Sequence, residues 1–327
     1  MAEFDFAILG AGAIGSILGA HLVRAGHRVA MLARGARAAQ LEAQGLRIRG
    51  LAELATPAIT LRDPARLRSA ATLIVATKTP GTAAALETLR HAQFDVVASI
   101  QNGPLKYELL AAAFGPEAVL GALADTSGEL LPDGAVLFTR NVNVMIGELS
   151  GADTARARAL AQTIDASGVR AAATTAIMKL EWSKFCGWVG LMSLSVVTRA
   201  ETWRYLADAD AARLLARLVR EMGTLAARLG IGLSDRAVLP AASLCAGSED
   251  QAVASLMQLG AEYRARVPQH RMSTLQDLLA RRPLEVHETI GYAHARAVEL
   301  GLELPMLECF TRLTAAIDHT QRAGAPV

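Results

Sequence analysis

The sequence contains little cysteine and has no marked excess of charge of either sign. Its three cysteines, Cys186, Cys245 and Cys309, are widely spaced, which suits neither a disulfide framework nor a zinc site. We therefore expect a cytoplasmic protein. The 33 Lys and Arg residues and the 31 Asp and Glu residues are interspersed, which indicates no basic surface of the kind that binds nucleic acid or acidic lipid. A small molecule is the expected partner, without nucleic acid or membrane.

The start of the chain lacks the features of a secretory signal, because Glu3 and Asp5 stand where a basic segment is needed. Residues 6–23 carry no Asp, Glu, Lys or Arg, and this run is about as long as a membrane span. The same run contains four glycines and His21, which disfavour a span. We interpret it as a short strand, a glycine turn and the start of a helix.

The length of the chain indicates more than one domain, since 327 residues are about twice the ~150 of a typical domain. A hydrophobic fraction of 52% and a charged fraction of 20% are typical of globular proteins. The 27 Gly and 11 Pro residues are too few for a fibrous or low-complexity chain. We expect two folded domains.

Short apolar runs alternate with Ala- and Leu-rich helical segments in the first half of the chain, which predicts βαβ units and a mostly parallel, doubly wound sheet. The expected strands are residues 6–9, 28–32, 72–76, 96–100, 119–121, 142–147 and 168–174, with a helix capped near Asp153 before the last. Only long helices are expected afterwards, over residues 181–199, 209–229, 249–263, 284–300 and 306–322. We predict an α/β domain over residues 1–175 and an all-helical domain over residues 176–327.

A glycine-rich motif, Gly10-Ala11-Gly12-Ala13-Ile14-Gly15, follows the first expected strand and opens a helix. In a dinucleotide site the first glycine makes a tight turn, the second admits a pyrophosphate and the third allows the helix to pack on the strand. The N–H groups of the helix start then face the phosphates. The motif therefore predicts dinucleotide binding, and the alternative is a purely structural glycine turn.

The end of the second expected strand predicts which dinucleotide binds. NAD enzymes usually carry an acidic residue there for the ribose hydroxyls, but this strand ends at Leu32-Ala33-Arg34. Arg34, backed by Arg37, is suited to bidentate pairing with a 2′-phosphate. NADPH is therefore the expected cofactor. The alternative is that Arg34 only caps a surface helix.

The chain prefers arginine and keeps only four lysines, which makes each lysine a candidate for function: Lys78, Lys106, Lys179 and Lys184. Lys78 follows an expected strand, at the edge where the loops of a parallel sheet meet a cofactor. Asn102 has the same position after the next strand, although Asn102-Gly103 is also a common turn dipeptide.

Lys184 opens a long expected helix on which Lys184, Trp188 and Met192 share one face. A lysine that leads an apolar face into an interdomain cleft suits a proton donor, because desolvation favours the neutral amine. The alternative is an exposed lysine in the first helical turn.

Ser273 and Glu285 have structural interpretations as well as functional ones. Ser273 to Gln276 is predicted to form a capping box with Ser273 at the N-cap. Glu285 is predicted to lie in the first turn of a helix that begins near Pro283, where the macrodipole favours a carboxylate. Both interpretations are compatible with a ligand site.

Two other chemistries find no support in the sequence. His287-Glu288 begins like the helix of a zinc protease, but Gly291 stands at the position of the second ligand, so no metal is expected. A Gly-x-Ser-x-Gly elbow is also absent, which argues against a serine hydrolase.

Ordered landmarks along nearly the whole chain resemble the ketopantoate reductase (2-dehydropantoate 2-reductase) family. They are Gly10 to Gly15, Arg34, Lys78, Gln101-Asn102-Gly103, Ile146-Gly147-Glu148, Trp182-Ser183-Lys184, Ser273 to Asp277, and Glu285. The resemblance implies an α/β N-terminal Rossmann-type doubly wound domain with an all-helical C-terminal domain. It also implies an NADPH-dependent oxidoreductase of pantothenate biosynthesis that reduces ketopantoate to pantoate.

The resemblance also implies roles for individual residues. Arg34 would bind the 2′-phosphate, while Lys78 and Asn102 would face the cofactor and Asn102 would also reach the substrate. In the second domain, Lys184 would be the general acid. Ser273 would hold the substrate carboxylate and Glu285 would act near the reacting centre or the substrate hydroxyl.

The chain departs from the family after Lys184, where the family usually carries Asn four and eight residues later. Here these positions are Trp188 and Met192, so we expect an apolar substrate pocket and a preference for bulky hydrocarbon 2-oxo acids. The alternative is that both side chains belong to the helical core. An opine-type dehydrogenase and a noncatalytic NADP-sensing module stay open as alternative functions, and a homodimer stays open as the assembly.

Overall fold

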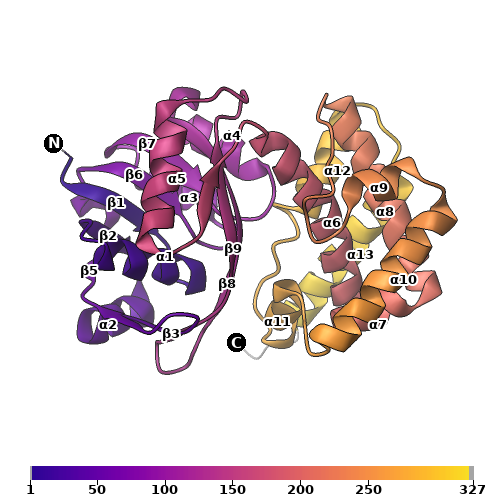
Figure 1. Ribbon diagram of the computed structural model, residues 1–327, viewed down its shortest axis with the longest axis horizontal. Coiled ribbons are helices and arrows are strands. Elements are labelled where there is room, and N and C mark those ends of the chain that lie inside the picture. The colour runs from indigo at the N-terminus through magenta and orange to yellow at the C-terminus, as the bar shows by residue number, and fades with distance from the viewer. Residues whose placement is uncertain (1, 324–327) are drawn as a thin grey trace. The chain divides into compact units, whose positions relative to one another are not determined.

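The computed structural model describes residues 2–323, which form two compact units (Figure 1). The first unit contains the chain up to Asn102 together with Lys106–Met178. The second unit contains Gly103–Leu105 and the chain from Lys179 onward. The predicted domain boundary follows residue 175, whereas the chain changes unit after Met178.

The first unit is built on one ten-stranded sheet. Its strands are β1 (Phe4–Leu9), β2 (Val29–Leu32), β3 (Leu46–Gly50), β4 (Leu54–Thr56), β5 (Ile59–Leu61), β6 (Ser69–Val75), β7 (Gln93–Ser99), β8 (Val119–Leu130), β9 (Val136–Gly147) and β10 (Ala171–Ala173). Their order is β4-β3-β9-β8-β7-β6-β1-β2-β5, and β10 lies beside β9. Only the β3–β4 and β8–β9 pairs of the described sheet are antiparallel. The predicted doubly wound, mostly parallel sheet is confirmed.

Helices cover both faces of this sheet because successive strand residues point to opposite sides. Phe6 and Ile8 of β1 join one apolar cluster with α1 (Ala13–Arg24), α2 (Gly35–Gln44) and α5 (Ala155–Ser167). Ala7 and Leu9 join the other cluster, with α3 (Thr82–Glu87) and α4 (Leu105–Phe114). Two 3₁₀ turns, Pro64–Arg66 and Pro116–Ala118, complete the unit.

Some strands of the first unit differ from the prediction. Strands β3, β4 and β5 were not expected, because they are short and none contains a long apolar run. Strand β8 extends to Leu130 rather than ending at Gly121, and its polar outer half is held by pairing with β9. The glycine-rich run of residues 6–23 forms β1, a turn and α1 as predicted. Among the helices that the structure describes, none combines the length and the apolar character needed to cross a bilayer.

All the regular secondary structure described over residues 179–323 consists of helices, joined by loops, which confirms the predicted class. Its helices are α6 (Ile177–Thr198), α7 (Thr202–Ala207), α8 (Ala209–Arg228), α9 (Ala241–Ala246), α10 (Glu249–Arg266), α11 (Ser273–Leu279), α12 (Ile290–Glu299) and α13 (Pro305–Ala323). Helices α6 and α8 approach closely at Gly190, where a Cβ atom would lie 2.2 Å from Leu215 Cδ1.

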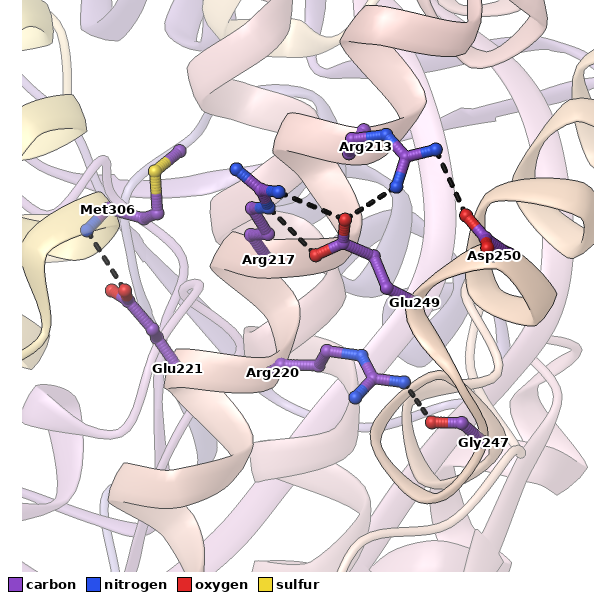
Figure 2. Close-up of polar contacts among 8 residues, drawn as sticks. All are labelled: Arg213, Arg217, Arg220, Glu221, Gly247, Glu249, Asp250 and Met306. Carbon is purple, nitrogen blue, oxygen red and sulfur yellow. Dashed lines mark hydrogen bonds and ion pairs between the residues drawn. The ribbon is translucent and has the colours of Figure 1, made fainter.

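Ion pairs join the long helices of the second unit (Figure 2). Glu249, at the start of α10, accepts hydrogen bonds from Arg217 (2.8 Å) and Arg213 (2.6 Å) of α8. These bonds lower the pKa of Glu249 to about 2. Glu221 of α8 accepts from the backbone N–H of Met306 at 3.0 Å, which satisfies a donor at the start of α13.

Candidate active site

Two glycines of the motif are crowded by neighbouring atoms and one faces open space, as a dinucleotide site requires. Gly10 adopts φ +106°, and a Cβ atom there would lie 2.7 Å from Thr77 N. A Cβ atom on Gly15 would lie 2.0 Å from the Gly10 carbonyl oxygen. A Cβ atom on Gly12, by contrast, would meet nothing within 4 Å, and Gly12 begins α1 without a side-chain cap. A pyrophosphate therefore fits against Gly12 and the first turn of α1.

Arg34 lies at the carboxyl end of β2, where the sequence analysis expects the 2′-phosphate. It is exposed and occupies the N-cap position of α2, but its side chain makes no capping hydrogen bond. The Arg34 side chain therefore does not cap α2, and only the Arg34 backbone occupies the N-cap position. An exposed guanidinium at this strand end suits an anionic ligand.

Arg37, in the first turn of α2, contacts other residues of the protein rather than facing solvent as Arg34 does. Its guanidinium donates at 2.8 Å to the carbonyl oxygens of Ala11 and Gly134 and to the hydroxyl of Ser16. Ser16 in turn donates to the Ala11 carbonyl at 3.1 Å. Partial burial lowers the pKa of Arg37. Arg37 thus braces the glycine motif, and Arg34 is the better candidate for contact with a phosphate.

Lys78 and Asn102 follow β6 and β7, which are neighbours of β1 in the sheet. Lys78 is exposed and Asn102 is half-buried. The structure therefore brings the candidate cofactor residues of the first unit to the carboxyl ends of four adjacent strands, β7, β6, β1 and β2. Ligands of doubly wound sheets bind at this edge.

Lys184 lies on α6 together with Trp188 and Met192. The prediction that Lys184 opens this helix is wrong, because α6 begins at Ile177 and Lys184 lies two turns inside it. Lys184 is half-buried, so the alternative of an exposed first-turn lysine is also wrong. The exposed fraction is 8% for Trp188 and 1% for Met192.

Ser273 is exposed, but the predicted capping box is wrong. The N-cap of α11 is Met272, whose backbone is extended, and no side chain caps the helix. Gln276 donates to the Arg271 carbonyl instead, at 3.4 Å. The Ser273 hydroxyl is therefore not used as a helix cap.

Glu285 is buried, with an exposed fraction of 5%, and lies in a turn before α12. The prediction that it occupies the first helical turn is wrong because α12 begins only at Ile290. The segment before Glu285 is held by Asp318 of α13, whose carboxylate accepts the Leu284 N–H at 3.0 Å and pairs with Arg322 at 2.9 Å. Residues 282–289 lie outside any helix, so the expected macrodipole interaction does not apply to Glu285.

The candidate residues divide between the two units. The first set comprises the glycine motif, Arg34, Lys78 and Asn102, and the second comprises Lys184, Trp188, Met192, Ser273 and Glu285. Over residues 2–323 no group of three or more His, Cys, Asp or Glu side chains is arranged to hold a metal ion.

Sequence reasoning did not assign roles to three side chains that support these sets: Gln101, Lys106 and Asp318. Gln101 lies in the Gln101-Asn102-Gly103 landmark, and Lys106 is one of the four lysines and follows this landmark in the sequence. Asp318 carries no local signal, since its partner Leu284 is distant in the sequence.

The chain matches two family models, described as "Ketopantoate reductase PanE/ApbA" over residues 6–151 and "Ketopantoate reductase PanE/ApbA C terminal" over residues 176–318. It is 25% identical over 313 residues to a 2-dehydropantoate 2-reductase of Archaeoglobus fulgidus, covering 95% of this chain and 97% of the relative.

Two solved structures share the fold across 97% of this chain and 99% of their own. They are a PanE/ApbA family ketopantoate reductase from Ralstonia eutropha (TM-score 0.82, 23% identity) and a D-mandelate dehydrogenase with NADH and anilino(oxo)acetate (TM-score 0.83, 20% identity). Because the two family models together span both units, the chain belongs to the ketopantoate reductase family of NADP-dependent oxidoreductases.

Proposed function

We propose that this protein reduces a bulky, apolar 2-oxo acid to the 2-hydroxy acid with NADPH. The observation that carries the proposal is the glycine motif of residues 10–15 together with Arg34 at the carboxyl end of β2. The open space at Gly12 accepts a pyrophosphate, while Gly10 and Gly15 have no room for a Cβ atom. Arg34 offers a cation where NAD enzymes usually offer a carboxylate.

The proposed reaction needs a proton as well as a hydride. NADPH, when bound, supplies a hydride to C2 and becomes NADP⁺. Lys184 donates a proton to the carbonyl oxygen, so that the C=O group becomes a CH–OH group and no alkoxide is left. The positive charge of Lys184 also stabilises the negative charge that develops on this oxygen.

The other proposed site residues orient the substrate. The exposed hydroxyl of Ser273 is suited to donate to the substrate carboxylate, and Asn102 is suited to contact both ligands. Glu285, which is buried, is assigned to the region of the reacting centre or of a substrate hydroxyl. These roles follow the family resemblance, position by position.

The preference for an apolar substrate rests on Trp188 and Met192, which replace amides of the family motif. Their exposed fractions of 8% and 1% also suit the alternative that both side chains belong to the helical core, so the double substitution by Asn decides between the two. An indole and a thioether offer an apolar surface and few hydrogen bonds to a substrate hydroxyl. The D-mandelate dehydrogenase of similar fold was solved with anilino(oxo)acetate, a ligand that carries a phenyl ring, which supports the proposal of an apolar substrate. Ketopantoate is then a modest substrate.

The experiment that tests the proposal is NADPH oxidation with a panel of 2-oxo acids, with and without a 4-hydroxyl group, and with added amines. We expect the highest kcat/KM for 2-oxo acids with bulky hydrocarbon side chains. Turnover only in the presence of an amine indicates an opine-type dehydrogenase. Saturable NADPH binding without oxidation of any substrate indicates an NADP-sensing module.

A further inference from the structure

The loops after β6 and β7 are joined by one buried side chain, that of Gln101, with an exposed fraction of 7%. Its amide nitrogen donates to the hydroxyls of Thr82 at 2.8 Å and Thr77 at 3.1 Å, and lies 3.2 Å from the carbonyl oxygen of Lys78. Its amide oxygen accepts from the Ser99 hydroxyl at 3.0 Å. Gln101, which directly precedes Asn102, is therefore tied to the backbone of Lys78.

The backbone of Gln101 is held by a second buried group, the ammonium of Lys106, with an exposed fraction of 2%. It donates to the carbonyl oxygens of Gln101 at 2.7 Å and of Ala122, on β8, at 2.9 Å. Lys106 therefore ties the end of β7 to β8, at the edge of the sheet that carries Lys78 and Asn102.

The Lys106 ammonium is placed against the helix macrodipole but is compensated by its two carbonyl acceptors and by the Tyr107 ring, whose centroid lies 5.0 Å away. It lies in the first turn of α4, where the helix macrodipole disfavours positive charge. Burial of an ammonium also costs free energy unless it is hydrogen-bonded. A purely structural position here suits an apolar side chain, as at the neighbouring Tyr107 and Leu110. A lysine in this place instead fixes two carbonyl groups at the cofactor edge.

We propose that Gln101 and Lys106 are positioning residues that hold Lys78 and Asn102 in place for the cofactor. Gln101 acts on Lys78 through its side-chain amide, and Lys106 acts on Asn102 through the Gln101 carbonyl. The proposal rests on the proposed NADPH-dependent function and on the family resemblance, which implies that Lys78 and Asn102 face the cofactor. Neither Gln101 nor Lys106 needs to touch the cofactor. The loss of either side chain is expected to let the loop after β6 or β7 shift, and Lys78 or Asn102 with it.

The test is a double-mutant cycle on the full chain, read as the dissociation constant of NADPH from a fluorescence titration. Gln101→Met keeps the side-chain length and removes every hydrogen bond of the side-chain amide, while the backbone carbonyl can still accept from Lys106. We therefore expect the Kd to rise about 10-fold, for NADH as well as NADPH. In the Lys78→Ala background the same change is expected to raise the Kd by less than about 2-fold, because the residue it positions is gone.

The second arm uses Lys106→Met, alone and in the Asn102→Ala background. Alone, it is expected to lower kcat/KM about 10-fold, and in the Asn102→Ala background by less than about 2-fold. Lys179→Met is the matched control, since Lys179 is exposed on α6, and it is expected to behave as the unmodified protein. If Gln101→Met does not fold, Thr82→Val removes the 2.8 Å acceptor and is expected to raise the Kd about 3-fold.

Additive losses in both cycles overturn the proposal, since they show that Gln101 and Lys106 do not act through Lys78 and Asn102. A lower melting temperature with an unchanged Kd also overturns it, because it assigns both residues to stability alone. Failure of the unmodified protein to bind NADPH is a different result: it refutes the proposed function itself and the positioning role with it.

Discussion

Arg34→Ala is expected to weaken the binding of NADPH far more than that of NADH. Arg34 is exposed at the end of β2, and its side chain makes no capping hydrogen bond in the free protein. The substitution therefore removes only an interaction with the ligand. A lost charge-assisted contact costs about 1.5–3 kcal/mol. At about 1.4 kcal/mol for each factor of ten, the Kd of NADPH rises about 10- to 150-fold.

The matched control for Arg34→Ala is Arg37→Ala, three residues along the same helix. Arg37 donates to Ala11 and Gly134 at 2.8 Å each, and its loss leaves the glycine motif without this brace. We expect Arg37→Ala to lower the melting temperature by several degrees and to weaken NADPH and NADH to a similar extent. Arg34→Ala is expected to change the melting temperature by less than about 2 °C.

The assay is a fluorescence titration of each variant with each cofactor at constant ionic strength, since salt screens a charge contact at the surface. The ratio of the two dissociation constants is the informative quantity. Equal losses of NADPH and NADH in Arg34→Ala refute the assignment of Arg34 to the 2′-phosphate.

Three further outcomes are expected. Lys184→Ala lowers kcat by about 10²–10⁴-fold and leaves the Kd of NADPH unchanged, in single-turnover and binding measurements; near-normal turnover removes Lys184 from the mechanism. Replacement of Trp188 and Met192 together by Asn raises kcat/KM for ketopantoate relative to bulky 2-oxo acids, whereas an unfolded variant, seen by circular dichroism, assigns both side chains to the core. His21 is buried, Nδ1 lies 3.0 Å from the Ser167 carbonyl oxygen, and Nε2 has no hydrogen-bond partner within residues 2–323. Burial lowers the pKa of His21 because it disfavours the charged imidazolium. The contribution of His21 to the free energy of unfolding is therefore fully present above the ordinary His pKa of about 6.5, and it is lost as the pH falls through the lower pKa of the folded state. Thermal melts of His21→Gln between pH 5 and pH 7.5 are expected to lose part of this dependence; an unchanged profile contradicts it.

The parts of the fold that could be predicted are those with a strong local pattern. The run from Phe4 to Arg24 combines an apolar strand, a glycine turn and a helix, and each glycine has the surroundings that its place in the motif predicts. Helix α8 is similar, since its apolar residues recur at helical spacing and are buried. Such segments need little information from the rest of the chain.

The parts that could not be predicted depend on contacts between distant residues. Helix α12 begins at Ile290 rather than near Pro283, and the segment before it is tied to α13 by the bond from the Leu284 N–H to Asp318, a pair that no local signal identifies. The role of Arg37 depends on the Gly134 carbonyl, which lies in the β8–β9 hairpin. Short strands such as β4 exist only because a neighbour supplies hydrogen bonds.

The most direct test of the central claim is the initial rate of NADPH oxidation by the purified protein across the 2-oxo acid panel, compared with the rate for NADH. We predict reduction of bulky hydrocarbon 2-oxo acids at a higher kcat/KM than ketopantoate, with NADPH preferred, and formation of one 2-hydroxy acid for each NADPH consumed. NADPH binding without oxidation of any 2-oxo acid contradicts the account.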